Sequence, residues 1–374
     1  MKNVSSPVRV LHILNSMNPG GTENVIMNYY RNIDLSTVQF DFLLTDNGFS
    51  FFEPEIIGMG GRIYRVPKLR LSNPFPYLFS VNVFLKEHPY YQIVHSHTSS
   101  KSFFPLLIAK INSVPIRISH SHSTSSGNGV AGVLLRVLKP FLRLVATDYL
   151  ACGEAAAQWL YGKSVNSVKI FRNVINAERF SYNPSIRTKM RQELGLSEDT
   201  LVIGHVARFN YAKNNAFTVD VFKEVLKKFP NSKLLLIGDG YLRKDIEKLV
   251  KESGIQGSVI FTGVVPNVYD YEQAMDCFML PSFYEGLPLS LIEAQTSGLK
   301  CFVSEFVPRE SSVTDLVSFL SLKDSFSYWA DAILSTYGYS RQSSIDQIRV
   351  AGYDAKTSSE VLQQFYLNRL KSSI

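Results

Sequence analysis

Two glutamates in the second half of the chain could bind a ligand that is rich in hydroxyl groups. Glu285 lies in a turn with the sequence Glu-Gly-Leu-Pro, and Glu293 lies further along, within about two turns, on an apolar helical run from Leu289. Pro288 suits the first turn of that helix, whose free N–H groups can bind phosphate. The alternative is that Glu293 lies on a helix surface. Its apolar neighbours favour a half-buried position instead, where a carboxylate needs a partner.

Two cations follow an apolar run at residues 201–206. Arg208 and Lys213 lie five positions apart in the sequence HVARFNYAKNN. Cations at the carboxyl end of a parallel strand can bind a diphosphate and stabilise it as it leaves. Taken alone, the same residues could form an ordinary basic loop.

A glycine turn follows the first apolar run, at residues 8–14. Gly20 and Gly21 precede Glu23 and a helical pattern at residues 25–30. Adjacent glycines let the backbone approach a ligand, and the N–H groups of the next helix attract anions. The turn is not a G-x-G-x-x-G sequence, so the dinucleotide fingerprint is absent here. By itself it could equally be a tight turn between a strand and a helix.

Four histidines occur as two pairs at the ends of expected strands: His95, His97, His120 and His122. The i, i+2 spacing places each pair on one face of its strand. No cysteine or carboxylate cluster accompanies them, so we expect hydrogen bonding to a substrate hydroxyl or phosphate rather than a metal site. A purely structural role for at least two of them stays open.

The elements that must position these residues alternate between short apolar strands and amphipathic helices. Expected strands lie at residues 8–14, 40–44, 60–66, 91–97, 116–120, 201–206, 233–237, 259–262, 277–280 and 301–304. This rhythm predicts an α/β fold with two doubly wound, Rossmann-like domains that face a central cleft. We expect one domain at 1–172 and the other at 173–357, with a helix at 183–199. A last helix within 358–374 could pack back on the first domain.

Bulk properties restrict the class of protein. The chain has 374 residues, three separated cysteines and a net charge of +7. Residues 1–172 hold 17 Lys and Arg against 9 Asp and Glu, so the first domain should meet something anionic, unless these cations only face solvent. The N-terminal apolar run is too short for a signal peptide, and no segment reaches the roughly 20 apolar residues that cross a bilayer. We therefore expect a cytoplasmic protein.

One amphipathic segment could touch a membrane from the cytoplasmic side. Residues 130–145 mix an apolar and a cationic face in the manner of an interfacial helix, although Pro140 must bend it. The alternative is a core helix that packs on the sheet. The expected location is therefore cytoplasmic, with contact at the inner face of the cell membrane as a hypothesis.

Taken together, the motifs resemble the retaining GT-B glycosyltransferases of glycosyltransferase family 4. The similarity lies in the order and spacing of the Gly-Gly-x-Glu turn, a strand-end histidine, the Arg and Lys loop, and Glu-x7-Glu leading into a helix. The sequences EAQTSGLKCFVS and RISHSHS look most like the capsular and exopolysaccharide branch. Ala207, Gln295 and Lys300 depart from the family's usual residues, which bears on the branch and the donor sugar more than on the reaction class.

The resemblance implies a role for each motif. Arg208 and Lys213 would hold the donor diphosphate, Glu293 the nucleotide ribose, and Glu285 the hydroxyls of the transferred sugar. His120 or His122 would contact the donor sugar near the reacting centre, and Glu23 and His97 would meet the acceptor. Backbone groups near the phosphates and sugar would come from Gly20, Gly21, Gly286, Leu287, Pro288 and Leu289. No cofactor or divalent metal is implied, and the chain has no Asp-x-Asp triplet.

The expected activity is transfer of a hexose from a nucleotide sugar, a UDP-sugar first of all, to a glycan or a polyprenyl-diphosphate-linked acceptor. A GT-B sugar-nucleotide epimerase is the alternative, but it needs acid and base carboxylates in the first domain, where Glu23 is the obvious candidate. A nucleic-acid-binding protein is a weaker alternative, because no basic run with interleaved aromatics supports it.

Overall fold

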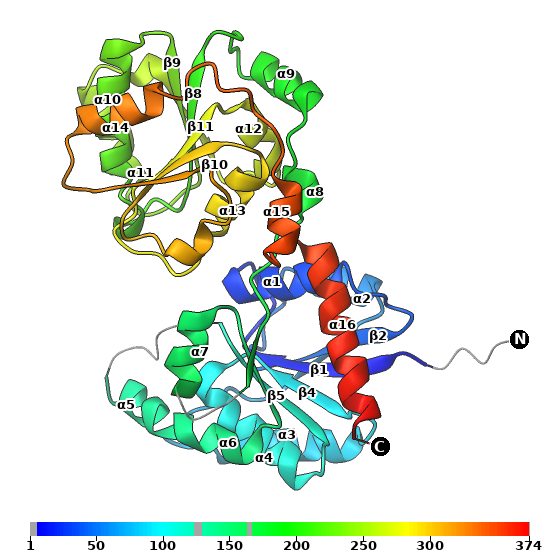
Figure 1. Cartoon of the computed structure of the whole chain (residues 1–374). Helices are drawn as coiled ribbons and strands as arrows, with labels where there is room; N and C mark the ends of the chain where they lie inside the picture. The colour runs from blue at the N-terminus through cyan, green and yellow to red at the C-terminus, as the bar shows by residue number, and fades with distance from the viewer. Residues whose placement is uncertain (1–5, 123–128, 163–166, 374) are drawn as a thin grey trace, which may run out of the picture. The chain divides into compact units, whose positions relative to one another are not determined.

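The computed structural model describes residues 6–122, 129–162 and 167–373 and divides the chain into two compact units. The first unit comprises Met1–Val174 together with Ala355–Ile374, and the second comprises Ile175–Asp354 (Figure 1). Each unit has its own parallel sheet and its own core. The prediction of two doubly wound α/β domains is therefore confirmed.

The first unit contains a seven-stranded parallel sheet in the order β3-β2-β1-β4-β5-β6-β7. Its strands are β1 (Val8–Leu14), β2 (Val38–Leu44), β3 (Ile63–Arg65), β4 (Ile93–Ser96), β5 (Ile116–Ser121), β6 (Asp148–Ala151) and β7 (Val168–Ile170). The strand order reverses at β1, which lies between β2 and β4. Loops diverge at such a point, and ligands of doubly wound sheets bind there.

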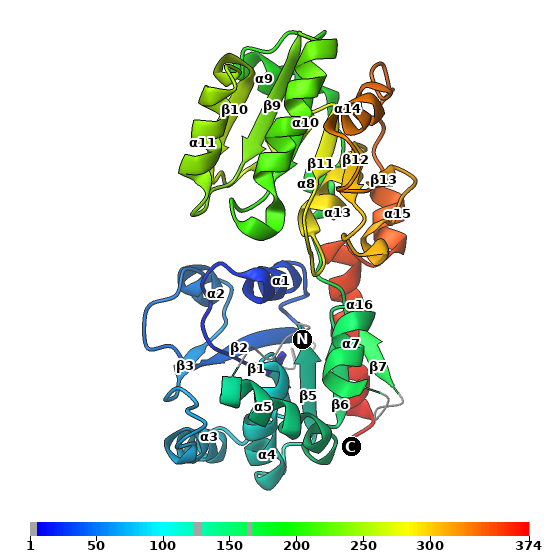
Figure 2. The same cartoon turned by 90° about the vertical axis from the view of Figure 1, so that its left-hand side faces the viewer.

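Helices cover both faces of this sheet (Figure 2). They are α1 (Gly21–Tyr30), α2 (Glu53–Gly58), α3 (Phe75–Glu87), α4 (Phe103–Ile111), α5 (Gly129–Leu138), α6 (Leu142–Val145), α7 (Glu154–Tyr161) and α16 (Ala355–Lys371), with the short 3-10 helices η1 (Ser99–Ser102) and η2 (Lys139–Phe141). Helices α3 and α4 pack on one face, against Leu11 and Val94. On the other face, Tyr30 of α1 and Tyr366 of α16 pack on Phe40.

The last helix, α16, completes the first unit. Ser359 donates from Oγ to the carbonyl of Tyr29 at 3.1 Å, and Arg369 forms an ion pair with Asp148 at 2.8 Å. Figure 1 shows α16 in red beside α1 in dark blue. The first sheet is therefore covered by helices from both ends of the chain.

The second unit contains a six-stranded parallel sheet in the order β10-β9-β8-β11-β12-β13. Its strands are β8 (Leu201–Val206), β9 (Ser232–Ile237), β10 (Val259–Gly263), β11 (Cys277–Leu280), β12 (Lys300–Ser304) and β13 (Val317–Leu320). Its helices are α8 (Ala177–Phe180), α9 (Pro184–Glu193), α10 (Asn215–Lys228), α11 (Arg243–Glu252), α12 (Val268–Ala274), α13 (Leu289–Thr296), α14 (Phe326–Leu334) and α15 (Ile345–Val350), with η4 (Tyr211–Lys213), η5 (Gln256–Ser258) and η6 (Arg309–Ser311). The strand order reverses between β8 and β11.

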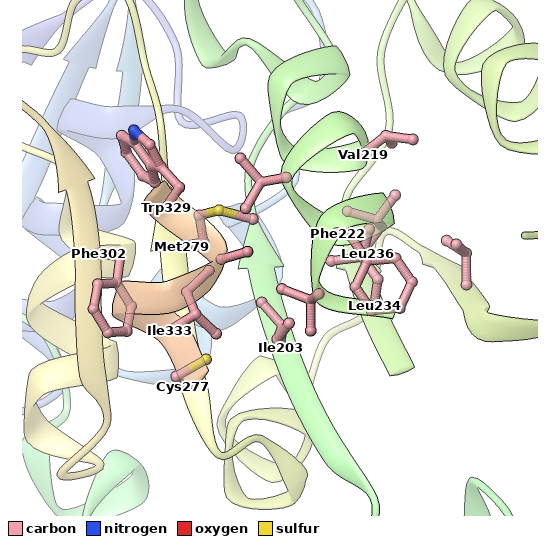
Figure 3. Close-up of a cluster of buried hydrophobic side chains, with 14 of the residues drawn as sticks. Ile203, Val219, Phe222, Leu234, Leu236, Cys277, Met279, Phe302, Trp329 and Ile333 are labelled. Carbon is pink, nitrogen blue, oxygen red and sulfur yellow. The ribbon is translucent and has the colours of Figure 1, made fainter. Parts of the chain in front are cut away.

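The core of the second unit lies between β8, β9 and β11 and the helices α10, α11 and α14. Figure 3 shows Phe222 of α10 and Trp329 of α14 among the buried strand side chains. The Trp329 ring nitrogen donates to the carbonyl of Ser321 at 2.9 Å, so the burial of this large side chain leaves no polar atom unpaired. Helix α13 packs on the opposite face through Leu291 and Ala294.

Two expected elements differ from the structure. The helix expected at 183–199 ends at Glu193, because Gly195 adopts a φ of +65° that terminates the helix. The segment 130–145 forms α5, η2 and α6 in place of one helix, with Pro140 inside the 3-10 helix η2. Among the described residues, no helix combines the length and the apolarity that crossing a bilayer requires.

Candidate active site

The loop that carries Arg208 follows β8 and is held by two glycines from the loop after β9. A Cβ atom on Gly238 would lie 2.1 Å from the carbonyl oxygen of Ala207, and one on Gly240 would lie 2.3 Å from that of Phe209. Gly238 also has a φ of +130°, which disfavours any side chain. Close backbone packing thus fixes the position of the main chain on both sides of Arg208. The guanidinium itself is exposed and has no hydrogen bond or ion pair to any described residue.

Lys213 and Glu285 form an ion pair between the loops after β8 and β11. The Lys213 ammonium lies 2.6 and 2.7 Å from the two carboxylate oxygens of Glu285. Ser282 donates from Oγ to Glu285 Oε1 at 2.7 Å. The Glu285 side chain is only 7% exposed, so the pair is largely shielded from water. These residues lie 72 positions apart, and the sequence predicted both of them but not their contact.

The same two loops are joined along their backbones. Asn210 caps η4 by accepting from the N–H of Lys213 at 3.2 Å, and the N–H of Phe283 donates to the carbonyl of Ala212 at 2.8 Å. Asn214 adopts a left-handed φ of 53° and donates to the carbonyl of Pro281 at 3.1 Å. The carboxyl ends of β8 and β11 are therefore rigidly linked, which keeps the Lys213–Glu285 pair in place.

Glu293 lies on α13 and is half-buried, as its apolar neighbours predict. Its carboxyl group has no hydrogen-bond partner among the described residues. Burial raises the pKa of Glu293 to about 7. The buried Glu272 of α12 also has a raised pKa, first through burial and then through the charge of Glu293. A carboxylate that is desolvated without a partner is a candidate ligand-binding group.

The turn before α13 leaves N–H groups free. Pro288 is the residue that caps α13 and not, as expected, part of its first turn. The N–H groups of Leu289 and Ser290 have no acceptor among the described residues. Gly286 is exposed, with open space where a side chain would point. Leu287 is half-buried and packs on a small apolar cluster of this unit.

The glycine turn of the first unit contains two different glycines. Gly20 caps α1 with an extended φ of −153°, and a Cβ atom there would lie 2.4 Å from a carboxylate oxygen of Glu23. A Cβ atom on Gly21 would meet nothing within 4 Å. Burial raises the pKa of Glu23. The protein's own packing therefore does not explain why Gly21 lacks a side chain.

The predicted histidine pairs meet on one face of the first sheet, and His12 of β1 joins them. His12 Nδ1 lies 2.9 Å from His97 Nε2, and His97 Nδ1 lies 2.8 Å from His122 Nε2. His95 Nε2 lies 3.1 Å from His120 Nδ1, and His95 Nδ1 lies 2.7 Å from the hydroxyl of Tyr366. His12 was not among the predicted site residues, because only the strand register places it opposite His95.

These histidines are neutral. Burial lowers the pKa of His12 to about 3 and that of His122 to about 4, and the pKa values of the other members fall well below the usual range. A neutral imidazole has one N–H and one bare nitrogen, so each chain of rings has a direction. Both nitrogens of His97 are occupied by histidines. At the ends of these rows of imidazole rings, three buried nitrogens have no hydrogen-bond partner among the described residues: His12 Nε2, His120 Nε2 and His122 Nδ1.

The ring nitrogens are close enough to be considered as metal ligands. One atom from each of His12, His95 and His97, and one from each of His97, His120 and His122, lie within 4.8 Å of one another. The short nitrogen–nitrogen contacts of 2.8 to 3.1 Å are hydrogen-bond distances. The expectation that the protein needs no metal stays a prediction.

Known proteins resemble this chain over nearly its whole length. The model of the family Glycosyl transferases group 1 matches residues 186–327. The chain is 36% identical over 372 residues to EpsF of Bacillus subtilis (strain 168), a protein named as a glycosyltransferase, with 97% of each chain covered. It is 23% identical over 322 residues, 81% of each chain, to the UDP-Gal:alpha-D-GlcNAc-diphosphoundecaprenol alpha-1,3-galactosyltransferase of Escherichia coli.

A solved structure supports the same fold assignment. The crystal structure of HepE from Anabaena in complex with UDP matches with a TM-score of 0.79 at 17% sequence identity, over 96% of this chain and 100% of that one. Two parallel-sheet domains of the GT-B type are thus common to both. The chain belongs to the glycosyl transferases group 1 family and is a glycosyltransferase.

Proposed function

We propose that this enzyme is a retaining glycosyltransferase of family 4 that transfers a hexose from a UDP-sugar during the synthesis of a surface polysaccharide, capsular or exopolysaccharide. The observation that carries the proposal is the carboxyl edge of the second sheet. There an unpaired guanidinium, a shielded Lys–Glu pair and a desolvated carboxylate follow two neighbouring strands. This set matches the charges and hydroxyls of a nucleotide sugar.

The donor binds to the second unit in this proposal. Arg208 and Lys213 hold the diphosphate and stabilise the negative charge that develops as it leaves. Glu293 accepts hydrogen bonds from the ribose hydroxyls, which supplies the partner that its buried carboxylate lacks. Glu285 contacts the hydroxyls of the transferred sugar while Lys213 holds its orientation. The N–H groups of Leu289 and Ser290 are further donors for phosphate or sugar oxygens.

The first unit supplies neutral hydrogen-bonding groups. His120 and His122 end the two imidazole chains, and in this proposal one of them contacts the donor sugar near the reacting centre. Because their pKa values are depressed by burial, they act as neutral donors or acceptors and not as cations. Gly20 and Gly21 remain candidates for close backbone approach to the ligand, and Glu23 and His97 for the acceptor.

The acceptor is a glycan or a polyprenyl-diphosphate-linked sugar. The Escherichia coli relative is named for a diphosphoundecaprenol-linked acceptor and a UDP-galactose donor, and HepE was crystallised with UDP. These names support the proposed substrate classes for this chain without identifying the sugar. The proposal includes no metal ion and no other cofactor, and transfer should therefore persist after treatment with a chelator.

A lipid-linked acceptor suggests a cytoplasmic enzyme that touches the inner face of the membrane. Helices α5 and α6 and the intervening η2 expose an apolar stripe at helical spacing that consists of Val133, Val137, Phe141 and Leu144. Arg136 and Arg143 are exposed beside it, while Leu135 and Leu142 point inward and are buried. An exposed apolar stripe flanked by cations is typical of an interfacial helix.

Co-sedimentation with phosphatidylglycerol vesicles tests the membrane contact. The wild-type protein should bind at low salt, and the double variant Val137→Asp with Phe141→Asp should bind at least severalfold more weakly, because both changes place negative charge in the exposed apolar stripe that would enter the lipid. Phe79→Asp, an exposed aromatic of α3 in the same unit, is the matched control. Wild-type protein that stays in the supernatant would remove the hypothesis.

A GT-B sugar-nucleotide epimerase is the second candidate. The specific observation in its favour is Glu23, whose carboxyl pKa is raised by burial in the first unit. Incubation with UDP-N-acetylglucosamine without acceptor separates the two. Free UDP without an epimer supports a transferase, and an epimerised nucleotide sugar contradicts the proposal.

A panel of nucleotide sugars, monitored by thermal unfolding, tests the donor assignment. A donor at about 100 times its Kd should stabilise the protein by about 2.7 kcal/mol and raise its melting temperature. Arg208→Ala should abolish this shift, and Lys244→Ala, an exposed lysine on α11, should preserve it. NMR of the product's anomeric proton then tests retention. A panel without any shift, or a product of inverted configuration, would refute the corresponding part of the proposal.

A further inference from the structure

A cavity of about 260 Å³ lies in the first unit, where β1 and β4 end and η1 begins. The residues that line it are Asn15, His97, Thr98, Ser99, Ser100, Lys101, Leu135 and Trp159. Of these residues only His97 has a role in the proposed function. Both ring nitrogens of His97 are already hydrogen-bonded to other histidines. The side chain can therefore hydrogen-bond to a ligand only if one of those bonds breaks.

Ser100 is the first sign of a ligand in this cavity. Its side chain is 3% exposed, and its Oγ has no hydrogen-bond partner among the described residues. The neighbouring hydroxyls do have partners, since Ser96 Oγ donates to Ser102 Oγ at 2.9 Å and lies 3.1 Å from Thr98 Oγ1. A buried hydroxyl without a partner is costly, so a group that binds in the cavity should satisfy it.

The backbone around Ser100 adds donors. The N–H groups of Ser99 and Ser100 have no acceptor among the described residues. Ser99 adopts a left-handed φ of 50°, uncommon for a residue with a side chain, at the point where the strand turns into η1. Because η1 continues directly into α4, these N–H groups stand at the positive end of a continuous helical segment.

Lys101 supplies a charge. It is half-buried and has no ion pair or hydrogen bond to any described residue. No Asp or Glu is among the described residues that line the cavity. Lys213 of the second unit, in contrast, is neutralised by Glu285. The cavity therefore combines a cation, a hydroxyl and two backbone donors, with no anion of its own.

We propose that this cavity binds a phosphate group of the acceptor, as found in a sugar linked to a polyprenyl diphosphate. Ser100 Oγ, the N–H groups of Ser99 and Ser100, and the Lys101 ammonium would donate to the phosphate oxygens. Trp159 and Leu135 form an apolar wall beside these donors and suit the sugar or the first part of the lipid. The inference rests on the proposed function, because it concerns that reaction's acceptor.

The charge distribution favours the acceptor over the donor as the source of this phosphate. The donor diphosphate has its own proposed cations, Arg208 and Lys213, on the second unit. The cavity lies entirely in the first unit, whose part before residue 173 contains 17 Lys and Arg against 9 Asp and Glu. A phosphate-bearing acceptor gives a reason for that excess of cations.

Paired acceptors test the proposal on the full-length protein. One is a short-chain prenyl-diphosphate sugar, and the other is the alkyl glycoside of the same sugar. Lys101→Ala and Ser100→Ala should each raise KM for the diphosphate acceptor by about 10- to 100-fold, as expected for the loss of a hydrogen bond to a charged group. KM for the alkyl glycoside and for the donor should stay unchanged. Lys101→Arg should restore most of the affinity.

Lys86→Ala is the matched control, because Lys86 is an exposed lysine of α3 in the same unit. Equal increases of KM for both acceptors would overturn the proposal, since the cavity would then bind the sugar. An increase of KM for the donor would assign the cavity to the donor diphosphate and would also overturn it. So would KM values that do not change. Thermal unfolding establishes that each variant is folded.

A binding measurement separates this inference from the proposed function. Inorganic pyrophosphate is titrated calorimetrically into the Arg208→Ala protein, in which the second unit's diphosphate site is weakened, and then into the same protein with Lys101→Ala or Lys86→Ala added. Loss of binding only with Lys101→Ala supports the cavity as a phosphate site even if no sugar transfer is observed. Equal binding to all three proteins would overturn it.

Discussion

At the carboxyl edge of the second sheet, Lys213 meets Glu285 as a shielded ion pair, whereas at the same edge of the first sheet five histidines hydrogen-bond to one another without net charge. Both edges occur where the strand order reverses, so topology alone does not distinguish them. The side chains do. In the proposed function, the second edge binds the anionic donor diphosphate, and the neutral histidines of the first edge meet hydroxyl groups.

The glycines of the two edges differ in the same way. Gly238 and Gly240 are required by the protein itself, because a side chain would overlap the backbone carbonyls of the Arg208 loop. Gly21 of the first unit faces open space and has no such internal reason. Packing against the Arg208 loop therefore accounts for Gly238 and Gly240, whereas Gly21 is exposed and has space for a side chain.

The largest expected effect comes from Arg208→Ala. The guanidinium has no partner among the described residues, so its removal should not lower the free energy of unfolding. If it stabilises the leaving diphosphate, kcat/KM should fall by about 100- to 1,000-fold. Steady-state kinetics with the donor from the panel measure this, and Lys244→Ala should behave as wild type. A loss below threefold would mean that the second edge does not carry the developing charge.

Glu285 and Glu293 should respond differently, although they lie on one loop and helix. Glu285→Ala should lower kcat by about 10- to 100-fold, because it removes both a sugar contact and the partner of Lys213. Glu293→Ala should instead raise KM for the donor by about tenfold and leave kcat nearly unchanged. In a Lys213→Met background, the effect of Glu285→Ala should shrink, since part of it comes from the broken pair. Wild-type kinetics in both single variants would contradict the assignment.

The sequence predicted the site residues at the carboxyl edge of the second sheet better than the histidine contacts at the carboxyl edge of the first sheet. Arg208, Lys213 and Glu293 follow strands and a helix whose apolar periods are strong, and each lies where the local pattern indicates. The contact between Lys213 and Glu285 could not be predicted in this way, because it depends on how two loops far apart in the chain meet in space.

The histidine contacts at the carboxyl edge of the first sheet depend on strand register, which a single sequence does not reveal. His12 lies within the apolar run at residues 8–14, and only the pairing of β1 with β4 brings it opposite His95. The hydrogen bonds of both His97 ring nitrogens to other histidines were likewise not predicted, and its contact with the acceptor stays a prediction. The short strands β6, β7 and β13 were not predicted, whereas the equally short strands β3, β4 and β11 were, so a run of three or four residues is an unreliable signal.

Two glycine substitutions test the contrast between packing and ligand approach. Gly238→Ala should destabilise the protein by roughly 1 to 3 kcal/mol, since it combines a positive φ with a clash against Ala207. Gly21→Ala should leave stability equal or slightly higher, and should raise KM for a substrate severalfold if a ligand approaches the backbone there. Gly257→Ala, which meets nothing within 4 Å and lies outside both edges, is the control. Thermal unfolding and kinetics together separate the two glycines, and a stable Gly238→Ala protein would contradict the packing argument.

A last expected effect is a dependence of donor affinity on pH that comes from Glu293. Burial raises its pKa from 4.5 to about 7, and only the carboxylate can accept from both ribose hydroxyls. Donor affinity should therefore rise by roughly tenfold between pH 6 and pH 8. The histidines of the first edge should not contribute, because they are neutral over this whole range. An intact nucleotide sugar is the suitable probe, since the terminal phosphate of free UDP titrates in the same window.

Stability should change in the opposite direction. A carboxyl group whose pKa is higher in the folded than in the unfolded state binds its proton more tightly when folded, so its contribution to stability is complete below about pH 4.5 and is lost as the pH rises to about 7. Glu293→Gln should remove both trends, leaving donor affinity flat across pH 6 to 8 and unfolding less sensitive to pH. A wild-type affinity that does not change between pH 6 and pH 8, measured by calorimetry, would mean that Glu293 is not the ribose ligand. Donor binding at the carboxyl edge of the second sheet would then depend on Arg208 and the Lys213–Glu285 pair.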